Sequence, residues 1–149
     1  MRLKDKVAIV TGGGAGIGEA IALKYAQEGA RVVVAEINPE RGQSTLEAIH
    51  KQGGEGIFAP TDVSVEDQVK AMVKTAIDRY GRIDILLNNA AILISHGDTR
   101  AHEVTNEVWD RTINTNLRGY WLCAKYTIPT MLAQGKGSII FVASRTGIR

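Results

Sequence analysis

Residues 11–18, which read TGGGAGIG, constrain the fold more than any other segment of the chain. A continuous apolar run at residues 7–10 precedes this segment, as expected of a strand that is buried on both faces, and a helical pattern follows it. A glycine-rich turn between a strand and a helix lets bare backbone approach a pyrophosphate at the helix N-terminus, where side chains would block it. The segment therefore predicts a dinucleotide-binding turn. The alternative is a flexible turn with incidental glycines.

Short apolar runs and helical patterns alternate along the rest of the chain, which predicts a parallel sheet with crossover helices. Strands are expected at residues 7–10, 32–35, 57–59, 83–87 and 138–142. Helices are expected from the glycine turn to about residue 29, at about 39–51, from Ser64 as N-cap to 81, after Thr105 as N-cap, and at about 116–134. Five strands joined by right-handed crossovers give a Rossmann-type, doubly wound α/β fold whose ligand lies at the carboxyl ends of the strands. A length of 149 residues predicts a single domain.

Composition excludes several classes of protein but does not indicate a particular activity. The chain is 44% hydrophobic and 23% charged with a net charge of +2, which is typical of a soluble globular protein and supplies no basic stripe for nucleic acid or anionic lipid. No apolar run reaches transmembrane length, so neither nucleic acid nor membrane is an expected partner, and the cytoplasm is the expected compartment.

Metal and disulfide chemistry are not expected either. A single cysteine, Cys123, excludes an internal disulfide and a cysteine zinc cluster, and fits a reducing compartment. His50 is expected on a solvated helix face, and His96 and His102 lie in a polar loop without a carboxylate pattern that suggests a metal site. We therefore expect no bound metal.

Glu36 bears on the choice of dinucleotide. It ends the second expected strand, 18 positions beyond Gly18. This sequence spacing is close to the one at which an acidic residue accepts hydrogen bonds from an adenosine ribose. A carboxylate there would repel a 2′-phosphate, by roughly 1 kcal/mol in bulk water and by more near a protein surface, so NAD(H) is expected over NADP(H). Two alternatives stay open: Glu36 is a solvated side chain, or Arg41 neutralises a phosphate because its helix turns inward.

Five motifs in order resemble the short-chain dehydrogenase/reductase family, and the resemblance covers the whole chain. They are TGGGAGIG at residues 11–18, Asp62-Val63 after the third strand, NNAA at residues 88–91, Asn116 at the start of the long helix, and Ser144 after the fifth strand. The GxxxGxG spacing departs from the GxGxxG of the broader dinucleotide fingerprint. The family usually has glycine where Ala91 stands, which affects only the local turn.

The resemblance implies a set of cofactor-binding residues. It places Asp62 and Val63 in an adenine pocket, and Asn89 and Ala90 beside the ribose on the nicotinamide side. The alternatives are an aspartate that begins a turn and amides that end a strand. With the glycine turn and Glu36, the expected set is Gly12, Ala15, Gly16, Ile17, Gly18, Glu36, Asp62, Val63, Asn89 and Ala90.

Two catalytic roles are implied by the same resemblance. Ser144 would hydrogen-bond the substrate hydroxyl or carbonyl group, and Asn116 would hold a water molecule in a proton relay; by residue type alone they would be a turn residue and a helix cap. The family's catalytic Tyr-x-x-x-Lys segment has no match here and would lie beyond Arg149. We therefore expect a fragment, residues 1–149, that is truncated before that segment, lacks the last strands of the sheet, and has no turnover alone.

The resemblance implies an oxidoreductase that transfers a hydride between NAD(H) and a small-molecule alcohol or ketone. A non-catalytic dinucleotide-binding module that holds NAD without turnover is the main alternative. A dehydratase or epimerase of the extended relatives ranks lower, because these usually carry a differently spaced glycine motif.

The expected helix at residues 116–134 is apolar on more of its surface than one sheet contact needs. One stripe comprises Leu117, Tyr120, Trp121, Ala124, Ile128, Met131 and Leu132, while Leu122, Cys123 and Tyr126 lie off it, and Pro129 is expected to kink the helix. A wide apolar surface suggests that a second face is buried by another subunit, giving a homodimer or homotetramer through this helix. An ordinary core helix is the alternative.

Overall fold

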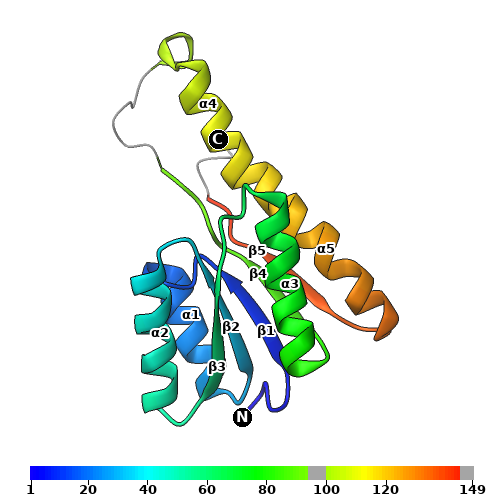
Figure 1. Ribbon diagram of the computed structural model, residues 1–149. Helices are drawn as coiled ribbons and strands as arrows, with labels where there is room; N and C mark the ends of the chain where they lie inside the picture. The colour runs from blue at the N-terminus through cyan, green and yellow to red at the C-terminus, as the bar shows by residue number, and fades with distance from the viewer. Residues whose placement is uncertain (94–99, 145–149) are drawn as a thin grey trace.

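The computed structural model describes residues 1–93 and 100–144, and its centre is one parallel sheet (Figure 1). The strands are β1 (Val7–Thr11), β2 (Arg31–Glu36), β3 (Glu55–Pro60), β4 (Ile85–Asn88) and β5 (Ser138–Phe141), in the spatial order β3-β2-β1-β4-β5. All neighbouring strands pair in parallel. The order reverses between β1 and β4, which confirms the doubly wound α/β fold.

Helices cover both faces of this sheet. They are α1 (Gly16–Gln27), α2 (Pro39–Lys51), α3 (Glu66–Tyr80), α4 (Asn106–Ile113) and α5 (Gly119–Ala133), with a 3₁₀ turn at Ala101–Glu103 and a π-helical turn at Asn114–Arg118. None of the helices in the described ranges is both long enough and apolar enough to span a bilayer.

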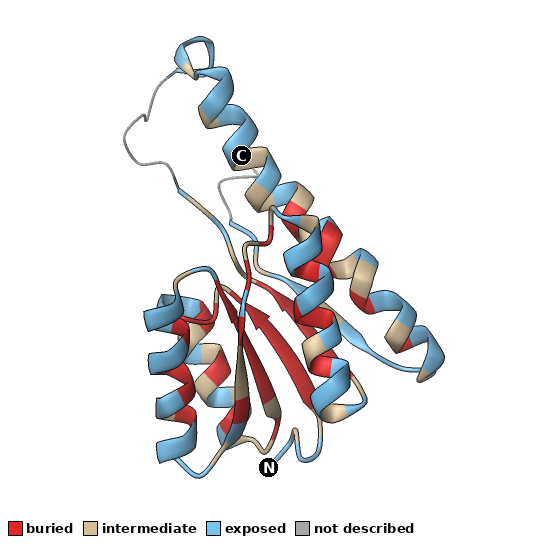
Figure 2. Cartoon of the chain, in the orientation of Figure 1, coloured by how far each residue is buried: buried red, intermediate tan, exposed pale blue. Residues whose placement is uncertain are grey.

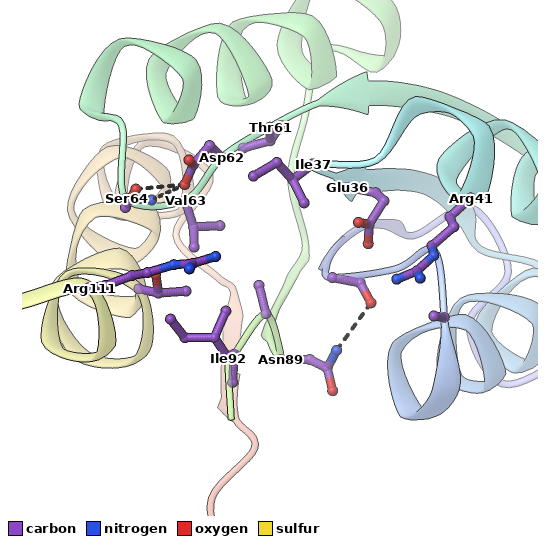
Figure 3. Close-up of a pocket in the computed structure, with 15 residues that line it drawn as sticks. Glu36, Ile37, Arg41, Thr61, Asp62, Val63, Ser64, Asn89, Ile92 and Arg111 are labelled. Atoms are coloured by element: carbon purple, nitrogen blue, oxygen red, sulfur yellow. Dashed lines mark hydrogen bonds between the residues drawn. The ribbon is translucent and has the colours of Figure 1, made fainter. Parts of the chain in front are cut away.

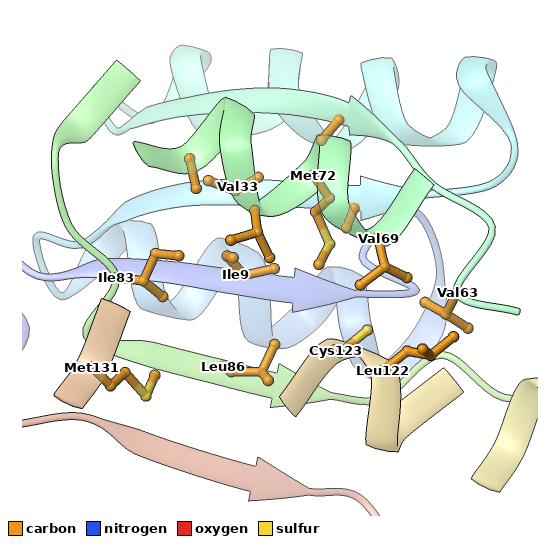
Figure 4. Close-up of a cluster of buried hydrophobic side chains, with 14 residues drawn as sticks. Ile9, Val33, Val63, Val69, Met72, Ile83, Leu86, Leu122, Cys123 and Met131 are labelled. Carbon is orange, nitrogen blue, oxygen red and sulfur yellow. The ribbon is translucent and has the colours of Figure 1, made fainter. Parts of the chain in front are cut away.

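The core has two layers because successive residues of a strand point to opposite faces. Ile9 belongs to a buried cluster with side chains of α3 and α5, such as Met72 and Leu122 (Figure 4). Val10, the next residue of β1, belongs to a second cluster with Ala22 of α1 and Ile49 of α2. Every residue of β1 is buried, as Figure 2 shows for the central strands, because both faces are covered.

Of the two predicted N-caps, one is confirmed and the other is not. Thr105 caps α4 as expected, because its hydroxyl accepts a hydrogen bond from the Val108 N–H at 3.3 Å. Ser64, however, is not the N-cap of α3: that position is Val65, without a side-chain cap. The Ser64 hydroxyl instead donates to the Asp62 carboxylate at 2.7 Å, so the preceding turn takes the group that would have capped the helix.

The long helix also starts earlier than predicted. Residues 106–133 pass from α4 through the π turn into α5, and both ends of the π turn have right-handed helical angles. Asn116 therefore lies inside the π turn instead of at a helix start. Pro129 lies inside α5, which continues to Ala133.

The apolar stripe that the sequence places on this helix is mostly the outer face of the helix, and the side chains off the stripe include the ones that are buried. Leu117, Trp121 and Leu132 are exposed, at 64%, 55% and 74%, whereas Leu122 and Cys123, placed off the stripe, are fully buried. The buried face includes Gly119, where an added Cβ would lie 2.8 Å from Val63 Cγ2. At this glycine α5 therefore comes close to Val63, which follows β3.

Candidate functional site

A cleft of about 530 Å³ lies at the carboxyl ends of the strands (Figure 3). Its walls include the ends of β1 and β4, between which the strand order reverses, and this is where ligands bind in doubly wound sheets. The volume is within the range of small-molecule sites. Seven of the residues predicted to bind a cofactor line it: Gly12, Ala15, Glu36, Asp62, Val63, Asn89 and Ala90.

Thr11 and Asn89 join β1 to β4 at the floor of the cleft. The Thr11 hydroxyl accepts hydrogen bonds from the N–H groups of Asn89 and Ala90, at 3.0 and 3.1 Å, and donates to the Leu87 carbonyl at 3.2 Å. In return, the Asn89 amide donates to the Thr11 and Gly12 carbonyl groups, at 3.1 and 3.3 Å. The two strand ends are thus held in register, and the strand-ending role considered for the asparagine is realised.

The backbone of the glycine turn packs closely against the end of β4, while the N-terminus of α1 carries no side-chain cap. Gly12 has φ +63°, and a Cβ there would lie 2.9 Å from Ala90 Cα; a Cβ on Gly18 would lie 2.0 Å from the Gly12 carbonyl oxygen. At the N-cap of α1, Ala15 offers no side-chain acceptor. The first-turn N–H groups of α1 can therefore donate to a bound anion, which fits a pyrophosphate.

Gly16, Ile17 and Gly18 do not line the cleft with their own atoms. Gly16 has φ +55° and open space beyond its Cα, Gly18 is buried under the turn, and the Ile17 side chain is 62% exposed. Their part in cofactor binding stays a prediction that rests on the backbone of the turn.

Glu36 is not a solvated surface side chain. It is only 8% exposed, and its carboxylate accepts hydrogen bonds from the Gly14 N–H and the Asn38 N–H, each at 3.1 Å. Hydrogen bonds to a charged acceptor fix its orientation more strongly than neutral ones do. The carboxylate is therefore anchored where β2 ends and also lines the cleft.

Asp62 and Val63 lie together on the adjoining wall, beyond β3. One carboxylate oxygen of Asp62 accepts hydrogen bonds from the Ser64 N–H at 2.9 Å and from the Ser64 hydroxyl. The aspartate thus begins a turn, as the alternative held, while its half-buried side chain still lines the cleft. Both roles are compatible because the carboxylate has two oxygen atoms.

The two residues with predicted catalytic roles lie outside the wall of this cleft. Asn116 accepts a hydrogen bond from the Ile92 N–H and donates one to the Ile92 carbonyl, both at 2.9 Å. It thereby ties the chain that leaves β4 to the π turn. Ser144 is exposed, three residues beyond the end of β5.

Several lining residues were missed by the sequence reasoning. Arg111 and Thr115 come from α4 and the π turn, and Figure 3 shows Arg111 entering the cleft opposite Glu36. No local signal marks them, because they reach the cleft only through the path of that helix above the sheet. Arg41 lines the cleft as well, so α2 does turn this side chain inward. Unlike Arg41, which the sequence had suggested, the remaining lining residues were not predicted to be there: Ile37, Thr61, Ser64, Ala91 and Ile92.

The described ranges contain no group of three or more His, Cys, Asp or Glu side chains that could hold a metal ion. His96 lies outside these ranges. Cys123 is a buried free thiol, and burial raises its pKa to about 12, so it is not a nucleophile at neutral pH.

Comparison with known proteins agrees with this geometry. A family model described as short chain dehydrogenase matches residues 6–149. The uncharacterized oxidoreductase YxbG of Bacillus subtilis (strain 168) is 44% identical over 146 residues, which cover 98% of this chain and 52% of the relative. The chain thus spans about half the length of the curated relatives it matches.

Two solved structures superpose closely on the chain. A 7α-hydroxysteroid dehydrogenase, in complex with NADH and 7-oxo glycochenodeoxycholic acid, has a TM-score of 0.92 and 31% identity, covering 99% of this chain and 56% of its own. Levodione reductase has a TM-score of 0.94 and 34% identity, covering 99% and 57%.

Proposed function

The chain belongs to the short-chain dehydrogenase family, and on that premise we propose that it binds NAD(H) in the cleft at the carboxyl ends of its strands. We further propose that the protein transfers a hydride between this cofactor and a small-molecule alcohol or ketone. One observation carries the proposal above the others: the anchored Glu36 carboxylate, the turn that precedes α1, and the Asn89 end of β4 all line one cleft.

The residues of the cleft suit each part of a dinucleotide. Donors at the uncapped N-terminus of α1 suit a pyrophosphate, and a carboxylate at the end of β2 suits ribose hydroxyl groups. Asp62 retains an oxygen that can accept from an exocyclic amine. The relative complexed with NADH supports the choice of cofactor, as does the repulsion between Glu36 and a 2′-phosphate.

Bound NAD(H) would supply the hydride acceptor or donor, and the chain would contribute polar groups around the substrate oxygen. We assign Ser144 the hydrogen bond to that oxygen. The side-chain oxygen and nitrogen of Asn116 both form hydrogen bonds with the backbone of Ile92. We therefore assign this side chain a positioning role that holds the π turn beside the cleft.

We also propose that the protein assembles as a homodimer or homotetramer through α5. The exposed side chains of Trp121, Ile128 and Leu132, together with Leu117 in the preceding π turn, form an apolar outer face that a second copy would cover. We assign the protein to the cytoplasm, a reducing compartment that suits the buried free thiol of Cys123.

The experiment that tests cofactor binding is a titration of NADH with the protein, followed by the fluorescence of the reduced nicotinamide. We expect enhanced, blue-shifted emission that ADP-ribose reverses by competition. No spectral change at protein concentrations well above micromolar would reject the proposed site.

Turnover, measured on a protein that also carries the Tyr-x-x-x-Lys segment expected beyond residue 149, separates the dehydrogenase from a module that only holds NAD. In a protein that oxidises NADH with a carbonyl substrate, Ser144→Ala should lower kcat and leave the Kd for NADH close to the original value. Binding of NADH without oxidation by any of a panel of ketones would favour the non-catalytic module.

A further inference from the structure

We propose that Arg118 and Glu66 are positioning residues for the adenine end of the cofactor: they hold the turn at residues 62–64, one wall of the cleft, against the start of α5. The proposal rests on the proposed function, because it concerns the same cleft. Neither side chain lines the cleft, so each acts through the turn and not through contact with the ligand.

The sheet gives the turn at residues 62–64 little support. β3 is an edge strand, and Thr61, just beyond its end, makes the last backbone hydrogen bond to the neighbouring chain, from its N–H to the Glu36 carbonyl at 2.9 Å. After this point the chain bonds to residues that follow closely, because the Asp62 N–H donates to Gln68 Oε1 at 2.7 Å. Contacts from another element therefore decide where the turn lies.

Arg118, the residue before α5, supplies the polar contact. One terminal nitrogen of its guanidinium group donates to the Ser64 carbonyl at 2.8 Å, and the other lies 3.6 Å from Glu66 Oε2. In the described ranges, the bond to Ser64 is the one hydrogen bond that reaches residues 62–64 from outside residues 62–68. A planar guanidinium group can hold two acceptors in fixed directions, which an ammonium group does less well.

Glu66 fixes the direction of this guanidinium group. It is the first residue of α3, and its side chain is partly buried. Its other carboxylate oxygen accepts hydrogen bonds from the Lys125 ammonium group at 3.1 Å and from the Tyr126 hydroxyl, both on α5. Because α5 holds one oxygen while the other faces Arg118, the pair is more restrained than an isolated surface ion pair.

An apolar contact at the next residue completes the docking of the turn. A Cβ on Gly119 would lie 2.8 Å from Val63 Cγ2 and 3.2 Å from the Val63 carbonyl oxygen, and Val63 is buried. With Val63 packed against the helix and the following carbonyl bound by Arg118, the rotation of the turn is fixed. The Asp62 carboxylate then lies on the wall of the cleft, as Figure 3 shows.

Two cofactors that differ only at the adenine test the proposal: NADH, and its deamino analogue, which carries hypoxanthine and lacks the exocyclic amine. The ratio of their Kd values, measured by nicotinamide fluorescence, reports how well Asp62 meets that amine. We expect the unaltered protein to prefer NADH by about tenfold, and Arg118→Met to reduce this preference to less than about threefold. Arg118→Lys should restore part of it, because an ammonium group can still donate to the Ser64 carbonyl.

Arg79→Met is the matched control, because it removes a guanidinium group from the other end of α3 and leaves the turn untouched. It should keep the full preference for NADH. Thermal unfolding followed by circular dichroism checks that each variant folds. If Arg118→Met does not fold, Glu66→Gln takes its place: it removes the charge that faces Arg118 and should lower the preference to less than about fivefold.

A folded Arg118→Met variant that keeps the full preference would overturn the proposal, as would an equal loss with Arg79→Met or a ratio near one in the unaltered protein. Weaker binding of both cofactors by the same factor would also contradict it, since general loosening of the fold does not distinguish adenine from hypoxanthine. The failure of the proposed function would look different, because the unaltered protein would then give no NADH signal at all.

Discussion

Single buried polar residues hold the strand ends that shape the cleft. Thr11 and Glu36 are almost fully buried, and each accepts hydrogen bonds from backbone N–H groups of another segment. Asp84 does the same at the opposite end of the central strands, where β1 and β4 begin: its carboxylate accepts from the Val7 N–H at 3.0 Å and from the Arg82 guanidinium group. Leaving such a group without its partner costs more than the hydrogen bond itself contributes.

Asp84→Asn should lower the free energy of unfolding by about 2 kcal/mol at neutral pH, because hydrogen bonds to a charged group are lost in a buried position. Burial by itself would raise the pKa of Asp84, but hydrogen bonds from Arg82 and Val7 outweigh it and hold that pKa below its usual value. The carboxylate therefore stabilises the fold above the ordinary aspartate pKa of about 4, and this contribution is lost as the pH falls further.

Urea unfolding of both proteins between neutral and acidic pH measures this effect. The difference in stability should shrink as the pH falls below about 4. Asp78→Asn is the control, because Asp78 forms an exposed pair with Lys74 and should change stability by less than about 0.5 kcal/mol. A difference that stays constant down to the lowest pH would contradict the assigned role of the charge.

At the scale of elements, the helical segment from α4 to α5 supplies a wall of the cleft that the sheet does not provide. Its π turn brings Thr115 to the cleft and holds Ile92 through Asn116, while Gly119 lets α5 approach Val63. A π turn inside an α-helix is uncommon and is often found at functional sites.

Asn116→Ala should destabilise the fold by about 1 to 3 kcal/mol, because it removes two hydrogen bonds and leaves the Ile92 backbone groups unpaired. Asn114→Ala is the matched control: this asparagine belongs to the same π turn, is exposed, and makes no side-chain hydrogen bond in the described ranges. Denaturant unfolding measures both. Equal small effects would mean that the Asn116 bonds do not hold the turn.

At the scale of the whole molecule, apolar surface remains on one side of the sheet. Trp121 and Leu132 are exposed along the outside of α5, as is Leu117 in the π turn before it, and Phe141 is 54% exposed on β5 at the edge of the sheet. An apolar surface spread over two neighbouring elements is typical of an interface.

Trp121→Glu combined with Leu132→Glu should shift the protein from an oligomer toward a monomer, because the assembled form would bury unpaired charges. Sedimentation velocity at several concentrations measures the change. Ile77→Glu serves as the control, since Ile77 is a partly exposed apolar residue on α3 and its substitution should leave the assembly intact. A monomeric unaltered protein would rule out α5 as the interface.

The sequence by itself determined the sheet, the turn before α1 and the position of Glu36. Buried strands are short continuous apolar runs, and glycine marks the places where backbone approaches backbone, so both signals are local. The fold class and most of the strand and helix positions could therefore be predicted without tertiary information.

Only the tertiary structure decided which face of α5 is buried and which distant side chains reach the cleft. Leu122 and Cys123 are as apolar as Trp121 and Leu132, so periodicity could not orient that helix; in the fold its buried face includes Gly119, which comes close to Val63. Arg111 enters the cleft because α4 passes above the sheet, and Arg41 does so because α2 begins beside Glu36. The rotation and path of a helix depend on contacts between residues far apart in the chain, and a local pattern does not contain them.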